Sequence, residues 1–163
     1  MIINNGLISL LFWPVYVLLF FIPTLIFIPK DKYRTLFIYG FIFGGLIDAL
    51  TIIIIGNWIG EFTYLAGPYV GGGIPIFVPI AFIFVWMLFF YFLPARTLFL
   101  VPYVIGFSGF SITVGSVLQN LGFFQLPHGN LRGALVTGIS FLVWFSFSAW
   151  FYLKDIKHYK GEM

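Results

Sequence analysis

The sequence predicts an all-α integral membrane protein, in which a bundle of five transmembrane helices forms a single domain over residues 1–163. Three observations support this fold class. The chain is 61% hydrophobic and 8% charged, whereas soluble domains contain about 25% charged residues. Five apolar stretches reach the roughly 20 residues that a helix needs to cross a bilayer. These stretches are apolar on every face, unlike the alternating strands of a membrane barrel.

The helices are expected at residues 7–28, 35–55, 74–93, 98–121 and 133–153. Pro14 and Pro23 fall inside the first helix, where a membrane helix tolerates them as kinks. The longest connection, residues 56–73, is too short for a soluble catalytic or nucleic-acid-binding domain. The chain has no cysteine, which excludes disulfides, thiolate zinc sites and iron–sulfur clusters, and we expect no cofactor.

The basic residues are distributed unequally between the two ends of the predicted bundle. With five spans, one end carries Lys30, Lys32, Arg34, Arg96, Lys154, Lys157 and Lys160, and the other end carries only Arg132. Loops rich in lysine and arginine stay on the cytoplasmic side of a membrane. We therefore expect the N-terminus outside and the C-terminus inside, and we expect the basic residues to set this orientation rather than to bind nucleic acid.

Asp48 is the acidic residue that lies deepest in a predicted span. An ionised group there costs about 2.5 to 3.5 kcal/mol on insertion scales, and such groups usually face the interior of a bundle. Gly40, Gly44 and Thr51 lie on the same helical face, at spacings of three or four residues. We expect Asp48 to point inward and to be neutral. Three interpretations remain open: a polar clasp between helices, a site for a proton or ligand, or a wrongly placed helix.

The fourth predicted helix is the expected partner of Asp48. Its polar or small residues recur at spacings of three or four, at Ser108, Ser111, Gly115 and Gln119. We expect them to supply hydroxyl and amide groups to the acid. The third predicted helix contains no strongly polar side chain besides Tyr91 near its end. The second, fourth and fifth helices are therefore expected to form the interior, and the third to face lipid.

The other candidate site residues lie toward one end of the predicted bundle, on the expected outer side. The predicted ligand-binding set is Asp48, Thr51, Glu61, Ser111, Gln119, Asn120, His128 and Arg132. Glu61 is either a solvated loop acid or the partner of Arg132 or His128 at the mouth of a site. Asp48, Glu61 and His128 have the ligand types of a metal site, but no short spacing supports one. We therefore predict no metal site and assign no catalytic residue.

Several of these features occur together in an order that resembles a known family. The residues concerned are Gly44-Gly45-Leu46-Ile47-Asp48, Trp58-Ile59-Gly60-Glu61-Phe62, Pro75 and Pro79, and Leu93-Pro94. The chain resembles an uncharacterised family of small five-helix membrane proteins of spore-forming Firmicutes. This resemblance implies a multi-pass protein of the bacterial cytoplasmic membrane and no particular activity.

The sequence leaves three functions open. The favoured one is a non-enzymatic protein whose outward-facing polar site around Asp48 binds or translocates a small polar or amphipathic ligand. The second is a structural or accessory subunit that packs through Gly40, Gly44 and Asp48. The third is an intramembrane enzyme that uses Asp48, Glu61 and His128. The expected partners are the lipid bilayer, a small ligand or lipid, and another membrane protein or a second copy of the chain.

Overall fold

The computed structural model describes residues 6–65, 70–71, 74–94, 96–126 and 130–159. It confirms the all-α class. The helices are α1 (Gly6–Phe27), a second helix over Lys30–Trp58, α4 (Phe77–Tyr91), α5 (Thr97–Asn120) and α6 (Asn130–Tyr159). Four of them, all except α4, are long and apolar enough to cross a membrane. The predicted bounds are closest for α1 and α5, while the second helix and α6 run further than expected.

The second helix is continuous but not uniformly α-helical. It begins with the short 3-10 turn η1 (Lys30–Lys32) and continues as α2 (Tyr33–Tyr39), η2 (Gly40–Leu46), α3 (Ile47–Thr51) and η3 (Ile52–Trp58). The segments η2 and η3 are π-helical. Segments of this kind are rare and are often found at functional sites. Here they flank α3, the five-residue stretch that carries Asp48.

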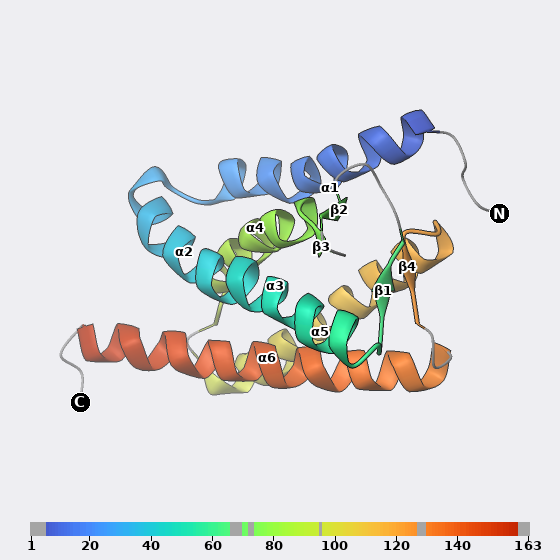
Figure 1. Cartoon of the computed structure of the whole chain (residues 1–163). Helices are drawn as coiled ribbons and strands as arrows, with labels where there is room; N and C mark the ends of the chain where they lie inside the picture. Colours follow the sequence, from blue (N-terminus) through green and yellow to red (C-terminus); the bar gives the residue numbers. More distant parts are fainter. Residues whose placement is uncertain (1–5, 66–69, 72–73, 95, 127–129, 160–163) are drawn as a thin grey trace.

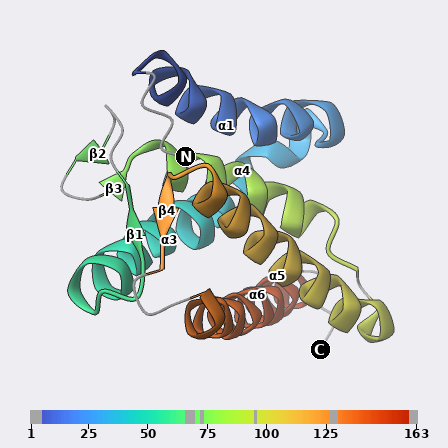
Figure 2. The ribbon, with the colours of Figure 1, turned by 90° about the vertical axis from the view of Figure 1, so that its right-hand side faces the viewer.

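The short helix α4 forms the centre of the bundle, so the prediction that it faces lipid is wrong. Both views show it running between α1 and α6 (Figure 1 and Figure 2). Its ring contacts reach both neighbours: Phe84 lies 5.0 Å from Phe21 of α1, and Trp86 stacks 4.5 Å from Phe145 of α6. Hydropathy gave the wrong answer because a helix that is apolar all round suits a protein core as well as lipid.

The length of α4 also differs from the prediction. It contains 15 residues, Phe77–Tyr91, whereas the predicted helix covered residues 74–93. At 1.5 Å per residue, α4 is about 22 Å long. The helix begins late because Ile74–Pro75 forms the strand β3, which pairs with β2 (Val70–Gly71). It ends before Pro94, as helices commonly do near a proline. A helix surrounded by its neighbours does not need the full thickness of the bilayer.

The small residues of the second helix provide the contact with α4. A Cβ atom added to Gly40 would lie 2.6 Å from the carbonyl oxygen of Ile83 and 2.9 Å from Met87 Cγ. Only a glycine therefore allows the two backbones to approach this closely. The predicted small-residue stripe is a packing surface, and its partner is the helix that the sequence had placed toward lipid.

Two connections at the same end of the bundle are joined to each other. The second helix and α5 both end at a glycine with φ of 77°, Gly60 and Gly122, a conformation that glycine adopts without strain. Beyond these turns, β1 (Thr63–Tyr64) pairs with β4 (Phe124–Gln125) in antiparallel fashion. We call residues 61–64 and 123–125 the cap. The pairing holds the cap across the ends of the two helices (Figure 2).

Candidate ligand-binding site

A cavity of about 90 Å³ lies beneath the cap, and its lining residues come from every helix and from both cap strands. The side chains that can form hydrogen bonds in it are Tyr16, Asp48, Thr51, Glu61, Tyr64, Ser111, Thr137, Ser140 and Trp144. The rest of the lining is apolar or aromatic, apart from glycines. Few, convergent polar groups in an apolar hollow are typical of small-molecule sites.

Asp48 is the most informative side chain in this cavity. It is 5% exposed, and the expected inward orientation is confirmed. Its Oδ2 atom is buried and has no hydrogen-bond partner among the described residues. A buried polar atom without a partner is destabilising by several kcal/mol in apolar surroundings, and native proteins rarely leave one unsatisfied. Because Asp48 lines the cavity, this atom is a candidate contact for a molecule bound there.

Glu61 is a second carboxylate at the edge of the same cavity. It follows directly after the Gly60 turn, which ends the second helix and directs the chain back over it. Glu61 Oε1 accepts a hydrogen bond of 2.9 Å from Arg132 Nη2 of α6, whose side chain is 62% exposed. Glu61 Oε2 is buried without a partner in the described structure. The ion pair therefore joins the cap to α6 at the rim of the cavity.

The hydroxyl groups of α5 do not serve Asp48 as expected. Ser111 lines the cavity, but its Oγ donates to the carbonyl oxygen of Phe107 at 3.0 Å. Thr51 Oγ1 likewise donates to the carbonyl oxygen of Ile47 at 2.8 Å. Hydroxyls on a helix in apolar surroundings use the carbonyl four residues earlier, which is always within reach. Their remaining lone pairs leave them as acceptors toward the cavity.

Three important side chains were not in the predicted site. Tyr16 of α1 is 7% exposed and lines the cavity, as does Tyr64 of β1. Burial raises the pKa of Tyr64 well above its usual value, and nearby Asp48 and Tyr16 add to this rise. Trp144 of α6 contributes an indole Nε1 that is buried with no partner in the part of the chain described. One signal was available: Tyr16 lies mid-span, away from the interfaces where tyrosine is common.

The other predicted site residues are more scattered. Thr51, Glu61 and Ser111 line the cavity together with Asp48. Gln119 and Asn120 lie at the end of α5, where Asn120 is exposed, and neither lines the cavity. Arg132 contributes only through Glu61. His128 lies outside the described residues. No cluster of three or more histidine or acidic side chains in the described ranges is placed to hold a metal ion.

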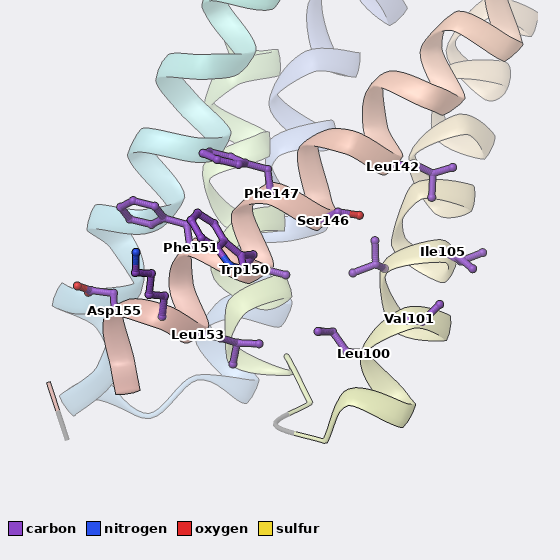
Figure 3. A pocket seen from close by; sticks show the side chains of 13 residues that line it. Leu100, Val101, Ile105, Leu142, Ser146, Phe147, Trp150, Phe151, Leu153 and Asp155 are labelled. Carbon is purple, nitrogen blue, oxygen red and sulfur yellow. The ribbon is translucent and has the colours of Figure 1, made fainter. Parts of the chain in front are cut away.

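A second, larger hollow is less suited to a polar ligand. It is an open groove of about 1120 Å³ between the first half of α5 and the second half of α6. Figure 3 shows its mostly apolar walls, with Leu100 and Ile105 on α5 and Leu153 on α6. Its charged residues, Lys154 and Asp155, both belong to one end of α6. Nothing in this groove matches the unpartnered polar groups of the cavity.

Comparison with known protein families, curated proteins and solved structures finds no match to this chain. The class of protein is defined by the helices themselves. Their length and composition are those of a membrane protein, and within it the cavity beneath the cap is the candidate functional site.

Proposed function

We propose that this chain is a multi-pass, non-enzymatic protein of the bacterial cytoplasmic membrane, and that its cavity around Asp48 binds or translocates a small polar ligand. The observation that carries the proposal is the Asp48 carboxyl group, which is 95% buried, lines a cavity and leaves Oδ2 without a partner among the described residues. A ligand with a complementary polar group would satisfy this atom.

The size of the cavity limits the ligand. A volume of about 90 Å³ is well below the about 300 Å³ of typical drug-sized sites. This favours a small polar molecule or ion over the amphipathic alternative. Acyl chains of the bilayer instead suit the apolar groove between α5 and α6.

The position of the cavity suggests that it opens on the outer side. The cap end carries Arg132, while the basic side chains at Lys30, Lys32, Arg34 and Arg96 belong to the opposite end. The positive-inside rule then places the cap outside the cell. This orientation agrees with a site that takes its ligand from the external medium.

The alternative functions have less support. A polar clasp or a subunit seam built on Asp48 would require a partner for its carboxyl group, and the close contact between the second helix and α4 is made by glycines instead. For an enzyme, Asp48 and Glu61 share the cavity, but Glu61 is paired with Arg132 and the Ser111 hydroxyl donates to its own helix. No activated nucleophile is therefore present among these residues.

The proposal is tested by filling the cavity without changing its charge. Gly115 lines the cavity, and a Cβ atom there would meet no described atom within 4 Å, so Gly115→Leu extends into free space. Gly109→Leu is the matched control, because Gly109 is an exposed residue of the same helix and does not line the cavity. Thermal unfolding of the purified protein is measured with a panel of small alcohols, amides, carboxylates and ammonium ions.

At least one solute should raise the unfolding midpoint of the wild type and of Gly109→Leu, because a ligand that binds only the folded state stabilises it. The same solute should have no effect on Gly115→Leu. The proposal is overturned if no solute stabilises the wild type, or if Gly115→Leu responds in the same way.

A further inference from the structure

The charges that line the cavity are all negative. Asp48 and Glu61 contribute two carboxyl groups, and no lysine, arginine or histidine is among the described lining residues. Arg132 reaches Glu61 Oε1 from the rim, so one carboxylate is compensated, whereas Asp48 has no cationic partner in the described structure. Without a partner, a carboxyl group in apolar surroundings takes up a proton and is neutral, as expected for Asp48, whereas a bound cation would stabilise its ionised form. A single cation at Asp48 would therefore complement the charge of this site.

The donor set does not suit a divalent metal. Calcium takes six to eight oxygen ligands and zinc takes four, commonly from several carboxylates, histidines or cysteines. Here the lining has two carboxyl groups, one of them paired with Arg132, and its other oxygens are hydroxyl groups. The hydroxyl groups of Ser111 and Thr51 already donate hydrogen bonds to backbone carbonyl oxygens. These oxygens can accept hydrogen bonds, which suits a cation that carries N–H groups.

The walls of the cavity are aromatic. Phe82, Phe141 and Trp144 form three nearly parallel rings, with interplanar angles of 12° for Phe82 and Trp144, 3° for Phe141 and Trp144, and 14° for Phe82 and Phe141. Aromatic faces attract organic cations, and cages of aromatic rings recognise ammonium groups in other proteins. Because all three rings line the cavity, they can contact a ligand held by Asp48.

A second aromatic group lines the cavity from the cap. Phe62, Tyr64 and Phe124 pack on one another, with centroids 5.3 to 5.9 Å apart. All three line the cavity. The cavity therefore has aromatic side chains both on the helices and in the cap, together with one uncompensated acid. A bound cation could contact aromatic rings on both sides.

Taking the proposed function as the starting point, we infer that the ligand is a small organic ammonium cation, with its N–H groups on Asp48 and its alkyl part against the Phe82, Phe141 and Trp144 rings. The volume of about 90 Å³ admits ions of the size of methylammonium and excludes large quaternary or lipid-like amines. This cation is expected to compete successfully with K⁺, which lacks both N–H donors and an alkyl surface.

The test is isothermal titration calorimetry of the full chain in detergent micelles, at constant ionic strength. The probes are methylammonium, methanol as a neutral molecule of similar size, and K⁺. The variants are Asp48→Asn, which keeps the shape of the side chain, and Asp31→Asn as the control, because Asp31 is an exposed acid of the η1 turn. Phe141→Leu removes one ring face while keeping an apolar side chain.

Methylammonium should bind the wild type and Asp31→Asn equally and should bind more tightly than K⁺ or methanol. Asp48→Asn should weaken this binding by at least about 10-fold, as expected for the loss of a charged hydrogen-bond partner. Phe141→Leu should weaken it by about 2- to 5-fold. Gly115→Leu, which leaves Asp48 in place, should also abolish binding and serves as the second variant if Asp48→Asn does not fold.

The inference is overturned if methylammonium does not bind, if Asp48→Asn binds it as well as the wild type, or if K⁺ or methanol binds more tightly. These results are distinct from a failure of the proposed function. A neutral solute that stabilises the wild type but not Gly115→Leu would retain the polar-ligand site and exclude the cation. If no solute acts through the cavity, both are wrong.

Discussion

Gly44 of the second helix lies directly against the backbone of Phe82 in α4: a Cβ atom at position 44 would stand 2.4 Å from the Phe82 carbonyl oxygen. Phe82 is also a wall of the cavity. The same contact therefore sets the distance between the two helices and the position of one aromatic ring in the site. Helix packing and the shape of the cavity are therefore linked at this residue.

Gly44→Ala should destabilise the protein by about 1 to 3 kcal/mol, because the added methyl group overlaps a backbone atom and the helices must separate. The measurement is unfolding in mixed micelles with increasing SDS. Gly109→Ala is the matched control, since an added Cβ there meets no described atom within 4 Å, and it should be neutral or slightly stabilising. Equal stability of Gly44→Ala and the wild type would contradict the close contact.

Without ligand, Asp48→Leu should leave stability unchanged or raise it by up to about 3 kcal/mol. The substitution removes a buried polar atom that has no partner among the described residues, and with it the penalty of leaving that atom unsatisfied. Thr24→Val is the contrasting variant, because Thr24 Oγ1 is buried and donates to the Phe20 carbonyl oxygen at 2.9 Å. It should lose about 0.5 to 1.5 kcal/mol. A large loss for Asp48→Leu would instead favour the clasp.

The Glu61–Arg132 pair should be weak when it is measured by itself. Because Arg132 is 62% exposed, a double-mutant cycle with Glu61→Gln and Arg132→Gln should give a coupling energy of about 0.2 to 1 kcal/mol. Arg132→Gln alone should be more harmful than Arg34→Gln, an exposed arginine far from the cap in the sequence, because Glu61 is only 14% exposed and would lose its cation. A cycle that gives no coupling would show that the contact contributes nothing in solution.

The absence of cysteine makes the chain a natural background for single-cysteine labelling of its orientation. Gln125→Cys lies in the cap and Asp31→Cys lies in the η1 turn, and both positions are exposed. A membrane-impermeant maleimide should label Gln125→Cys in intact cells, and Asp31→Cys only after permeabilisation. Neither change removes a basic residue, so the positive-inside signal is kept. The reverse labelling pattern would place the cap in the cytoplasm.

The sequence was most informative about features that depend on local cost. A carboxylate raises the free energy of insertion of any membrane helix that carries it. The inward orientation of Asp48 could therefore be predicted from its position alone. The Glu61–Arg132 pair was among the alternatives because the two charges belong to the same predicted end. The presence of five helices followed from hydropathy and length, although only four of those described are long enough to cross a membrane.

Features that depend on long-range contacts could not be predicted in this way. The central position of α4 was missed because lipid and protein interior select the same apolar side chains. Tyr64 was missed because its position depends on the pairing of β1 with β4, two segments about 60 residues apart in the sequence. Gln119 follows the face of Ser111 and Gly115 in spacing, but it lies beyond the part of α5 that lines the cavity.

The π-helical segments on either side of α3 have a geometric consequence for Asp48. A π turn contains more residues than an α turn, and one residue of an α-helix corresponds to about 100° of rotation about its axis. The angle between Gly40, which faces α4, and Asp48, which faces the cavity, thus depends on η2. Conversion of either segment to a regular α-helix would turn one end of the second helix against the other. The backbone hydrogen bonds of η2 therefore set the direction of Asp48 relative to the face of the second helix that packs on α4.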